Sequence, residues 1–413
     1  MKQLTFTEKL QITKNPLFIA FLMLALTTLG PLTMDIYLPS LPAMVHALGS
    51  TNHVMQLTIT INLLGYSLSQ LVYGPYSDRY GRRPVIMAGL LIAWLGSIIA
   101  VFAHTAPSLI LGRLLQGMGL GVGNVLMRAV LRDTLSGVRM ARIGSYMGMV
   151  FAVLPAVAPV LGGYVQASFG WRANFVLMLL FVTLILILMF CCLPETNRQL
   201  NLQATRWRMI GSNYWYLLTH KGFMGNVVCT SCAISGMFAY HTASPFLFQN
   251  VLGLSPVKYG WLALGIAFGL MMGNFVNSLA LRRWQSLQIL QTGIVLMLLS
   301  SLTMFVFSAF DILNVSVVLV PIIFFLAAGG LIFANAMTGA LMPFPEMAGV
   351  AAALYGCLQI LGAFVTTLIV AGLHQNNQQA LSLVFILLAV IALGAFYGLI
   401  KRADRVNSSL DAA

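Results

Sequence analysis

The sequence has too few charged residues to cover a water-facing surface of its size. Aspartate, glutamate, lysine and arginine make up 8% of the 413 residues, whereas a soluble domain carries about 25%. Only nine residues are acidic, against 22 lysines and arginines. Most side chains must therefore face lipid or other parts of the protein, which excludes a soluble enzyme or binding domain.

The signatures of several chemistries are also absent. There are five cysteines, and Cys229 and Cys232 have the spacing of a metal or redox pair. No second pair or ligand cluster accompanies them, which favours two small side chains one helical turn apart. No G-x-x-x-x-G-K-[ST] loop and no nucleophile–base pair occurs. We therefore expect neither an ATP-driven pump nor an enzyme, and no metal or cofactor.

Long apolar runs are present instead: 59% of the residues are hydrophobic, and the mean hydropathy is +0.91. Runs of about 20 residues have the length of a membrane-spanning helix, whereas a barrel strand would alternate in polarity. We predict an all-α polytopic membrane protein with twelve spans. The predicted spans are 16–38, 54–76, 85–104, 107–129, 143–166, 173–193, 223–247, 257–280, 288–309, 314–340, 350–372 and 380–400.

A single long polar interval divides these spans into two halves. We predict an N-terminal six-helix bundle (1–193), a cytoplasmic central loop (194–221) and a C-terminal six-helix bundle (222–413). Arg82-Arg83 and Arg282-Arg283 follow the second span of each half, as in a duplicated, pseudo-symmetric unit. With both termini cytoplasmic, every lysine and arginine except Arg113, Arg172 and Lys258 falls on the cytoplasmic side, as the positive-inside rule expects. Anionic lipid then accounts for the net charge of +13 without nucleic acid.

One acid and one base lie within the predicted spans, apart from Arg128 and Lys258 at span ends. Asp35 is near the end of the first span, and Arg113 is about six residues into the fourth, which runs the opposite way, so their depths match. An intramembrane carboxylate usually pairs with another group or marks a proton route. We predict that Asp35 and Arg113 couple transport to protons. The alternatives are a static salt bridge between two helices and a hydrated Asp35 that caps a loop.

Aromatic and amide side chains recur along several spans. Such a mixture suits a cavity for uncharged or cationic organic molecules, although each residue alone is also common in helix packing. For His241, near a helix end, an ordinary hydrogen-bonded histidine is more common than a titrating one. We predict a substrate cavity formed by Tyr37, Asn62, Tyr66, Gly117, Asn124, Tyr240, Asn335 and Gln359.

The segment after the second span reads Gly74-Pro-Tyr-Ser-Asp78-Arg79-Tyr-Gly81-Arg82-Arg83. It is similar to the G-x-x-x-D-R-x-G-R-R signature of the major facilitator superfamily. The sequence also resembles the Bcr/CflA group of drug:proton antiporters. That resemblance covers most of the chain, through Asp35-Ile-Tyr-Leu-Pro39, Arg113-Leu-Leu-Gln116-Gly117, Arg132-Asp133, Leu193-Pro-Glu-Thr196 and Ser244-Pro245-Phe246.

The resemblance implies roles for particular residues. It implies that Asp78 faces the start of the eleventh span, where a helix N-terminus favours negative charge, and that Arg113 acts with the acid of the first span. A cytoplasmic latch that favours the outward-open state is expected from Gly74, Asp78, Arg79, Gly81, Arg82, Arg83 and Asp133. In the fifth span, Leu154 and Ala158 replace two glycines of the exporters' G-x-x-x-G-P-x-x-G-G motif. Pro159, Gly162 and Gly163 match it, and Pro155 adds a second proline to this exporter-like segment.

Together these features predict a monomeric, proton-coupled exporter of small, mainly lipophilic organic molecules in the bacterial inner membrane. Proton-driven uptake of a nutrient or metabolite on the same fold is the alternative, and the direction of flux separates the two. A receptor that binds a ligand without moving it is a third possibility.

Overall fold

A computed structural model describes residues 15–135, 137–197, 199–373 and 377–402. Every regular element in these ranges is a helix. The first half contains α2 (Pro16–Asp35), α4 (Asn52–Tyr80), α5 (Arg82–Val101), α6 (Ala106–Thr134), α7 (Gly137–Phe169) and α8 (Trp171–Cys192). The second half contains α10 (Lys221–Phe246), α11 (Pro256–Ala280), α12 (Ser286–Ala309), α13 (Val315–Leu341), α14 (Ala348–Gly372) and α15 (Gln379–Ala395).

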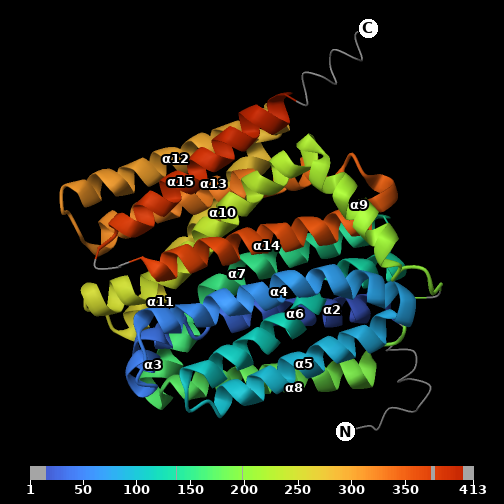
Figure 1. The fold of residues 1–413 in the computed structure, drawn as a ribbon, viewed down its shortest axis with the longest axis horizontal. Helices are drawn as coiled ribbons and strands as arrows, with labels where there is room; N and C mark the ends of the chain where they lie inside the picture. The colour runs from blue at the N-terminus through green and yellow to red at the C-terminus, as the bar shows by residue number, and fades with distance from the viewer. Residues whose placement is uncertain (1–14, 136, 198, 374–376, 403–413) are drawn as a thin grey trace.

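Short helices connect or extend these elements. They are η1 (Leu38–Ser40), α3 (Leu41–Ala47), α9 (Trp207–Thr219), η2 (Leu247–Val251), η3 (Pro345–Met347) and η4 (Phe396–Ile400). In Figure 1, α3 and α9 lie at opposite ends of the long helices, and these ends are called the α3 end and the α9 end below. α9 was not predicted, because it lies in the polar interval that we read as a loop.

The lengths and hydropathies confirm a multi-pass membrane protein. Among the described residues, ten helices are long and apolar enough to cross a bilayer, and α7 adds a shorter apolar stretch, Val153–Phe169. α4 has 29 residues but also carries Gln56, Asn62 and Gln70, which lower its mean hydropathy. Large apolar side chains such as Leu180 and Phe190 are more than half exposed on α8, as expected for a surface that faces lipid.

Side-chain caps begin several of these helices. Asn15 accepts a hydrogen bond from the backbone of Leu17 at the start of α2, and Thr51 and Thr105 cap α4 and α6 in the same way. Such caps satisfy backbone donors that the first helical turn leaves unpaired. Polar residues at the ends of the apolar runs therefore set where the spans begin.

The two halves pack by the same pattern. In the first half, α4 and α5 contact α6, α5 also contacts α8, and α2 contacts α6, α7 and α8. In the second half, α11 and α12 contact α13, α12 also contacts α15, and α10 contacts α13, α14 and α15. Each of these contacts thus has its counterpart in the other half. Between the halves, α4 lies along α14 and α7 along α11, and Figure 1 shows the two halves above and below this junction.

Candidate functional site

Asp35 is the last residue of α2, not an interior residue of a longer span as the sequence reading assumed. Pro39, four residues later, has no backbone N–H to donate to the Asp35 carbonyl oxygen, so the α-helix ends and the chain continues through η1 into α3. The Asp35 side chain is nevertheless only 4% exposed. Its carboxylate Oδ1 lies 3.3 Å from Nδ1 of His241 in α10, without the geometry of a hydrogen bond. An acid of the first half therefore faces a histidine of the second.

Arg113 of α6 is fully buried but does not pair directly with Asp35. Its guanidinium donates to the carbonyl oxygens of Thr33 (3.1 Å) and Thr58 (3.4 Å) and to Oε1 of Gln116 (2.9 Å). It also lies 4.3 Å from the centre of the Tyr37 ring. The predicted depth of Arg113 was correct, since it reaches the turn of α2 that precedes Asp35.

The carboxylate of Asp35 and the guanidinium of Arg113 form no ion pair in this conformation, because matched depth does not fix the direction in which a side chain points. Their predicted coupling of transport to protons stays a prediction. The carbonyls of α2 and α4 lie closer to the guanidinium. Asp35 acts on Arg113 only through its charge, over a longer distance.

The two halves are joined across the α3 end, and we call this set of contacts the closed seam. His53 Nδ1 of α4 lies 2.7 Å from the Ala371 carbonyl oxygen, Gln56 donates to the Thr242 carbonyl oxygen (3.0 Å), and Gln249 donates to the Pro39 carbonyl oxygen (3.1 Å). These bonds are buried or partly buried. Any opening at this end must break them.

Two glycines of α7 let the backbones of neighbouring helices approach closely beside this seam. A side chain at Gly162 would overlap the carbonyl group of Ile36, and one at Gly163 would meet the carbonyl of Pro256 in α11. Gly260 of α11 faces the carbonyl of Pro159 in return. All four predicted span-five residues thus lie in one helix, α7. Gly162 and Gly163 provide close approach to α2 and to the second half.

A cavity of about 690 Å³ opens between the halves at the α9 end. Two of the predicted cavity residues line it, Asn124 of α6 and Gln359 of α14. Asn124 donates to Oε1 of Gln70 across the cavity wall (3.1 Å). Apolar and aromatic side chains such as Phe333 complete the lining. The volume and the mixed lining suit a small organic molecule.

The other six predicted cavity residues do not line this cavity. Tyr37 is buried against Arg113, and Asn62 donates to the backbone of Arg113 (2.8 Å). Gly117 packs on the backbone of α4, and Tyr66 and Tyr240 lie among the buried helices. Asn335 instead bonds Asn277 (2.6 Å) and Ser286 (2.6 Å), which makes it a packing residue of α11, α12 and α13.

Arg128 also lines the cavity, although the predicted set of cavity residues did not include it. It lies on the cavity-facing side of α6, remains accessible to the cavity, and has Tyr66 and Tyr355 close to its guanidinium. Among the described residues no carboxylate lies within ion-pair distance of it. Its regular spacing after Arg113 and Asn124 on one helical face was the signal that could have found it.

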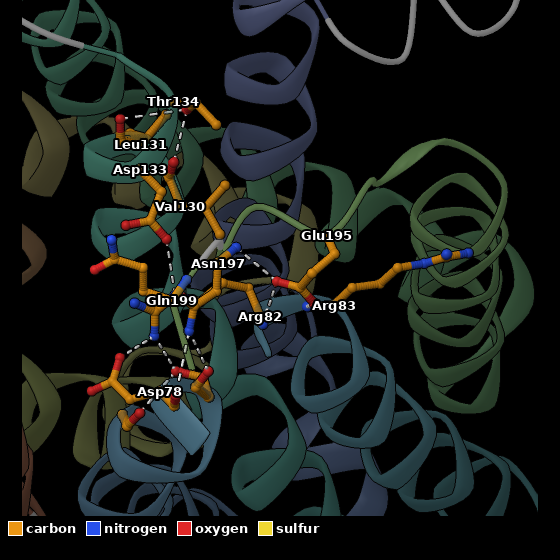
Figure 2. A network of polar contacts seen from close by, with 12 residues as sticks. Asp78, Arg82, Arg83, Val130, Leu131, Asp133, Thr134, Glu195, Asn197 and Gln199 are labelled. Carbon is orange, nitrogen blue, oxygen red and sulfur yellow. Dashed lines mark hydrogen bonds and ion pairs between the residues drawn. The ribbon is translucent and has the colours of Figure 1, made fainter. Parts of the chain in front are cut away.

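The charged motif at the end of α4 and the start of α5 forms a network within the first half, shown in Figure 2. Arg82 is buried, and its guanidinium contacts Asp78 (2.5 Å), Asp133 at the end of α6 (3.1 Å) and the hydroxyl of Ser77 (2.6 Å). Arg79 bonds Thr205 of the connector (2.6 Å), and Arg83 bonds the Phe190 carbonyl oxygen (2.8 Å). Of the predicted latch residues, Gly74, Asp78 and Arg82 line the cavity, and Asp78 and Asp133 are the two that pair with Arg82.

Asp78 does not touch the start of α14. Its carboxylate and Ala348, the first residue of α14, line the same cavity, and no hydrogen bond or ion pair of the described residues joins them. The expected latch contact between the two halves is therefore absent in this conformation, whereas the latch contacts within the first half are formed.

Glu195 is a second residue that the prediction missed. Its carboxylate accepts hydrogen bonds from the backbone of Arg82 (2.9 Å) and Arg83 (3.1 Å) at the start of α5 and from Asn197 (2.8 Å). Gly81 has a φ of 99°, and a side chain there would collide with the carboxylate. This explains why the motif needs glycine at this position. The stretch Leu193-Pro-Glu-Thr196 was noted for resemblance alone, and nothing in it pointed to a helix cap.

Comparison with known proteins decides the family. The family model described as Major Facilitator Superfamily matches residues 17–367. The chain belongs to the major facilitator superfamily. Membership makes it a membrane transporter of small molecules rather than an enzyme.

The relatives carry transport and resistance names. The chain is 32% identical over 370 residues to multidrug resistance protein D of Escherichia coli, covering 90% of this chain and 92% of that protein. It is 27% identical over 377 residues to a bicyclomycin resistance protein homolog of Haemophilus influenzae, covering 91% and 94%. Among solved structures, a partially occluded inward-open form of the xylose transporter XylE from E. coli matches with a TM-score of 0.69 and 14% identity, covering 92% and 97%. That last likeness shows the fold alone.

Proposed function

We propose that this family member exports small, mainly lipophilic organic molecules from the bacterial cytoplasm in exchange for protons. The similarity to multidrug resistance protein D over 90% of the chain is the observation that carries the proposal. The geometry supports it, since a cavity suited to an organic molecule lies at one end and a buried acid lies at the other.

The transport cycle follows from these two features. The cavity at the α9 end admits substrate from the cytoplasm while the closed seam excludes the outside. Reorientation of the halves closes the α9 end and opens the seam, which exposes Asp35 to the outside, where it takes up a proton and substrate leaves. When the seam closes again, the proton is released to the cytoplasm. Arg113, with its charge near Asp35, favours the return to the ionised carboxylate.

The proposed orientation places the α9 end in the cytoplasm. The basic residues Arg79, Arg82, Arg83 and Arg132 lie at this end, and basic cytoplasmic loops are the rule in membrane proteins. Both termini are then cytoplasmic, although most of each lies outside the described residues. We further propose a monomer in the inner membrane, without a nucleic-acid partner, in which residues 1–193 and 222–413 move as two units and 194–221 connects them.

Purified protein in proteoliposomes tests the proposal. An imposed proton gradient should drive a lipophilic fluorescent dye against its concentration gradient, and a protonophore should abolish this movement. Asp35→Asn should abolish coupled transport while exchange of unlabelled for labelled dye continues. Full proton-driven transport by Asp35→Asn would contradict the proposal, and gradient-driven movement in the same direction as the protons would support uptake instead.

A further inference from the structure

The closest titratable neighbour of Asp35 belongs to the other half of the molecule. Nδ1 of His241 lies 3.3 Å from Oδ1 of Asp35, and both side chains are about 5% exposed. α2 and α10 are not neighbours within a bundle, so this contact is part of the closed seam. Gln56 donates to the carbonyl oxygen of Thr242, the next residue of α10, which fixes the backbone beside the histidine.

When it is ionised, the carboxylate of Asp35 needs a cationic partner at this position. Asp35 ends α2, and the last turn of a helix carries partial negative charge, which disfavours a carboxylate there. Arg113 is engaged by Thr33, Thr58 and Gln116 and does not bond the carboxylate. A protonated His241 is the group that lies within ion-pair distance.

The other charged and titratable groups near the pair come from three helices. Arg113 of α6 and Tyr259 of α11 are close enough to interact electrostatically with Asp35. On α10 itself the rings of Phe238 and Tyr240 lie 5.7 Å and 6.0 Å from the His241 ring. From α4 the neighbour is Gln56, which is uncharged. Among the described residues, no second carboxylate forms an ion pair with His241.

We propose that His241 is the proton-dependent tether of the closed seam. The ionised carboxylate of Asp35 holds the imidazolium of His241, and with it α10 against α2. A proton that Asp35 takes up once the α3 end has opened removes the charge that holds the histidine, so the equilibrium shifts toward the open α3 end. The inference rests on the proposed function, because it names the residue through which the Asp35 proton acts on the movement of the halves.

The seam contains a matched control. His53 also bridges the halves at the α3 end, from α4 to the Ala371 carbonyl oxygen in α14, but it faces a carbonyl and no carboxylate. A histidine that merely stabilises the seam would behave like His53. A tether for Asp35 would respond to the charge of Asp35, and a double-mutant cycle separates these two behaviours.

Opening is measured by pulsed spin-label distances between the exposed positions Ala47 in α3 and Asn250 in η2, with Cys191 and Cys192 changed to Ser. The measurements use full-length protein in liposomes, without substrate, over a pH series. In the unchanged protein the open fraction should rise as pH falls, because protonation of Asp35 releases the tether. Asp35→Asn should show at every pH the larger open fraction that the unchanged protein shows at low pH. His241→Gln should raise the open fraction about fivefold or more, remove most of its pH dependence and add little to Asp35→Asn.

His53→Gln should loosen the seam, keep the pH dependence and add fully to Asp35→Asn. The proposal is overturned if His241→Gln keeps the pH profile of the unchanged protein, or if its effect adds to that of Asp35→Asn as that of His53→Gln does. Since no substrate is present, either result stands apart from the transport assay. Proton-driven export with an additive His241→Gln would leave the proposed function intact and remove the tether alone.

Discussion

The carbonyl oxygen of Ile36 occupies the space where a side chain at position 162 would begin. Gly162 of α7 thereby lets the end of α2, with Asp35 at its last position, pack tightly against the fifth long helix. The glycine pair of the exporter-like motif and the proposed proton site are therefore parts of one contact region.

Gly162→Ala should weaken this region. The added methyl must displace the end of α2, which costs about 1–3 kcal/mol in a packed interior and should lower the melting temperature and raise the open fraction at the α3 end. Both are measured in the spin-labelled protein. Gly394→Ala is the control, because nothing lies within 4 Å of a side chain at that position of α15. Equal melting temperatures for the two variants would contradict the contact.

Arg82→Gln should destabilise the α9 end of the first half. The change leaves Asp133 and Asp78 without their common cation, and hydrogen bonds to charged groups contribute about 1.5–3 kcal/mol each when buried. Because the Asp78 side chain is 47% exposed, we expect a loss near the lower limit, read as a lower melting temperature. Arg83→Gln, whose contact to Phe190 is exposed, should change it little; a similar loss in both variants would show that general charge removal is responsible.

Glu195→Ala should loosen the start of α5. The carboxylate caps two backbone donors of that helix, and a lost cap costs about 1 kcal/mol. Glu195→Gln keeps an oxygen acceptor and should lose about half as much, with the difference declining at high salt because it comes from charge. Thermal unfolding at two salt concentrations checks this, and identical losses at both would argue against the charge contribution.

Arg128→Gln should change the charge preference of the cavity. Arg128 has no acidic partner among the described residues and repels cations that enter from the α9 end. Its removal should therefore raise the affinity for a lipophilic cation relative to a neutral analogue of the same shape by about tenfold, or 1.4 kcal/mol. Binding titrations with the matched pair measure the ratio. Arg282→Gln, at an exposed position outside the cavity lining, is the control for net charge, and an equal shift there would assign the effect to the whole surface.

Much of the fold could be predicted from the sequence, because hydrocarbon thickness dictates the length of apolar runs. The spans around Arg113 and Asn124 were placed well, and Arg113 does reach the depth of Asp35. That the two form no ion pair in this conformation could not be predicted, because a sequence gives depth along the bilayer normal but not the rotation of a buried side chain. Their role in proton coupling stays a prediction.

Other features of the site could not be predicted from the sequence. His241 belongs to the second half of the chain, and only packing brings it to Asp35. Asn335 looked like a cavity amide, yet neighbouring helices satisfy it. α9 lay in a polar interval, where its few buried side chains, Ile210 and Leu217 among them, were too sparse to predict a helix.

α9 has a consequence for how the substrate range of this transporter can change. Ile210, Asn213 and Tyr214 of α9 line the cavity beside residues of α6 and α14. The segment that links the halves is thus part of the vestibule through which a molecule enters. Substitutions in this connector should alter which molecules enter without disturbing helix packing inside the bilayer. Substrate selectivity can therefore diverge between relatives at positions where tight packing does not limit the choice of residue.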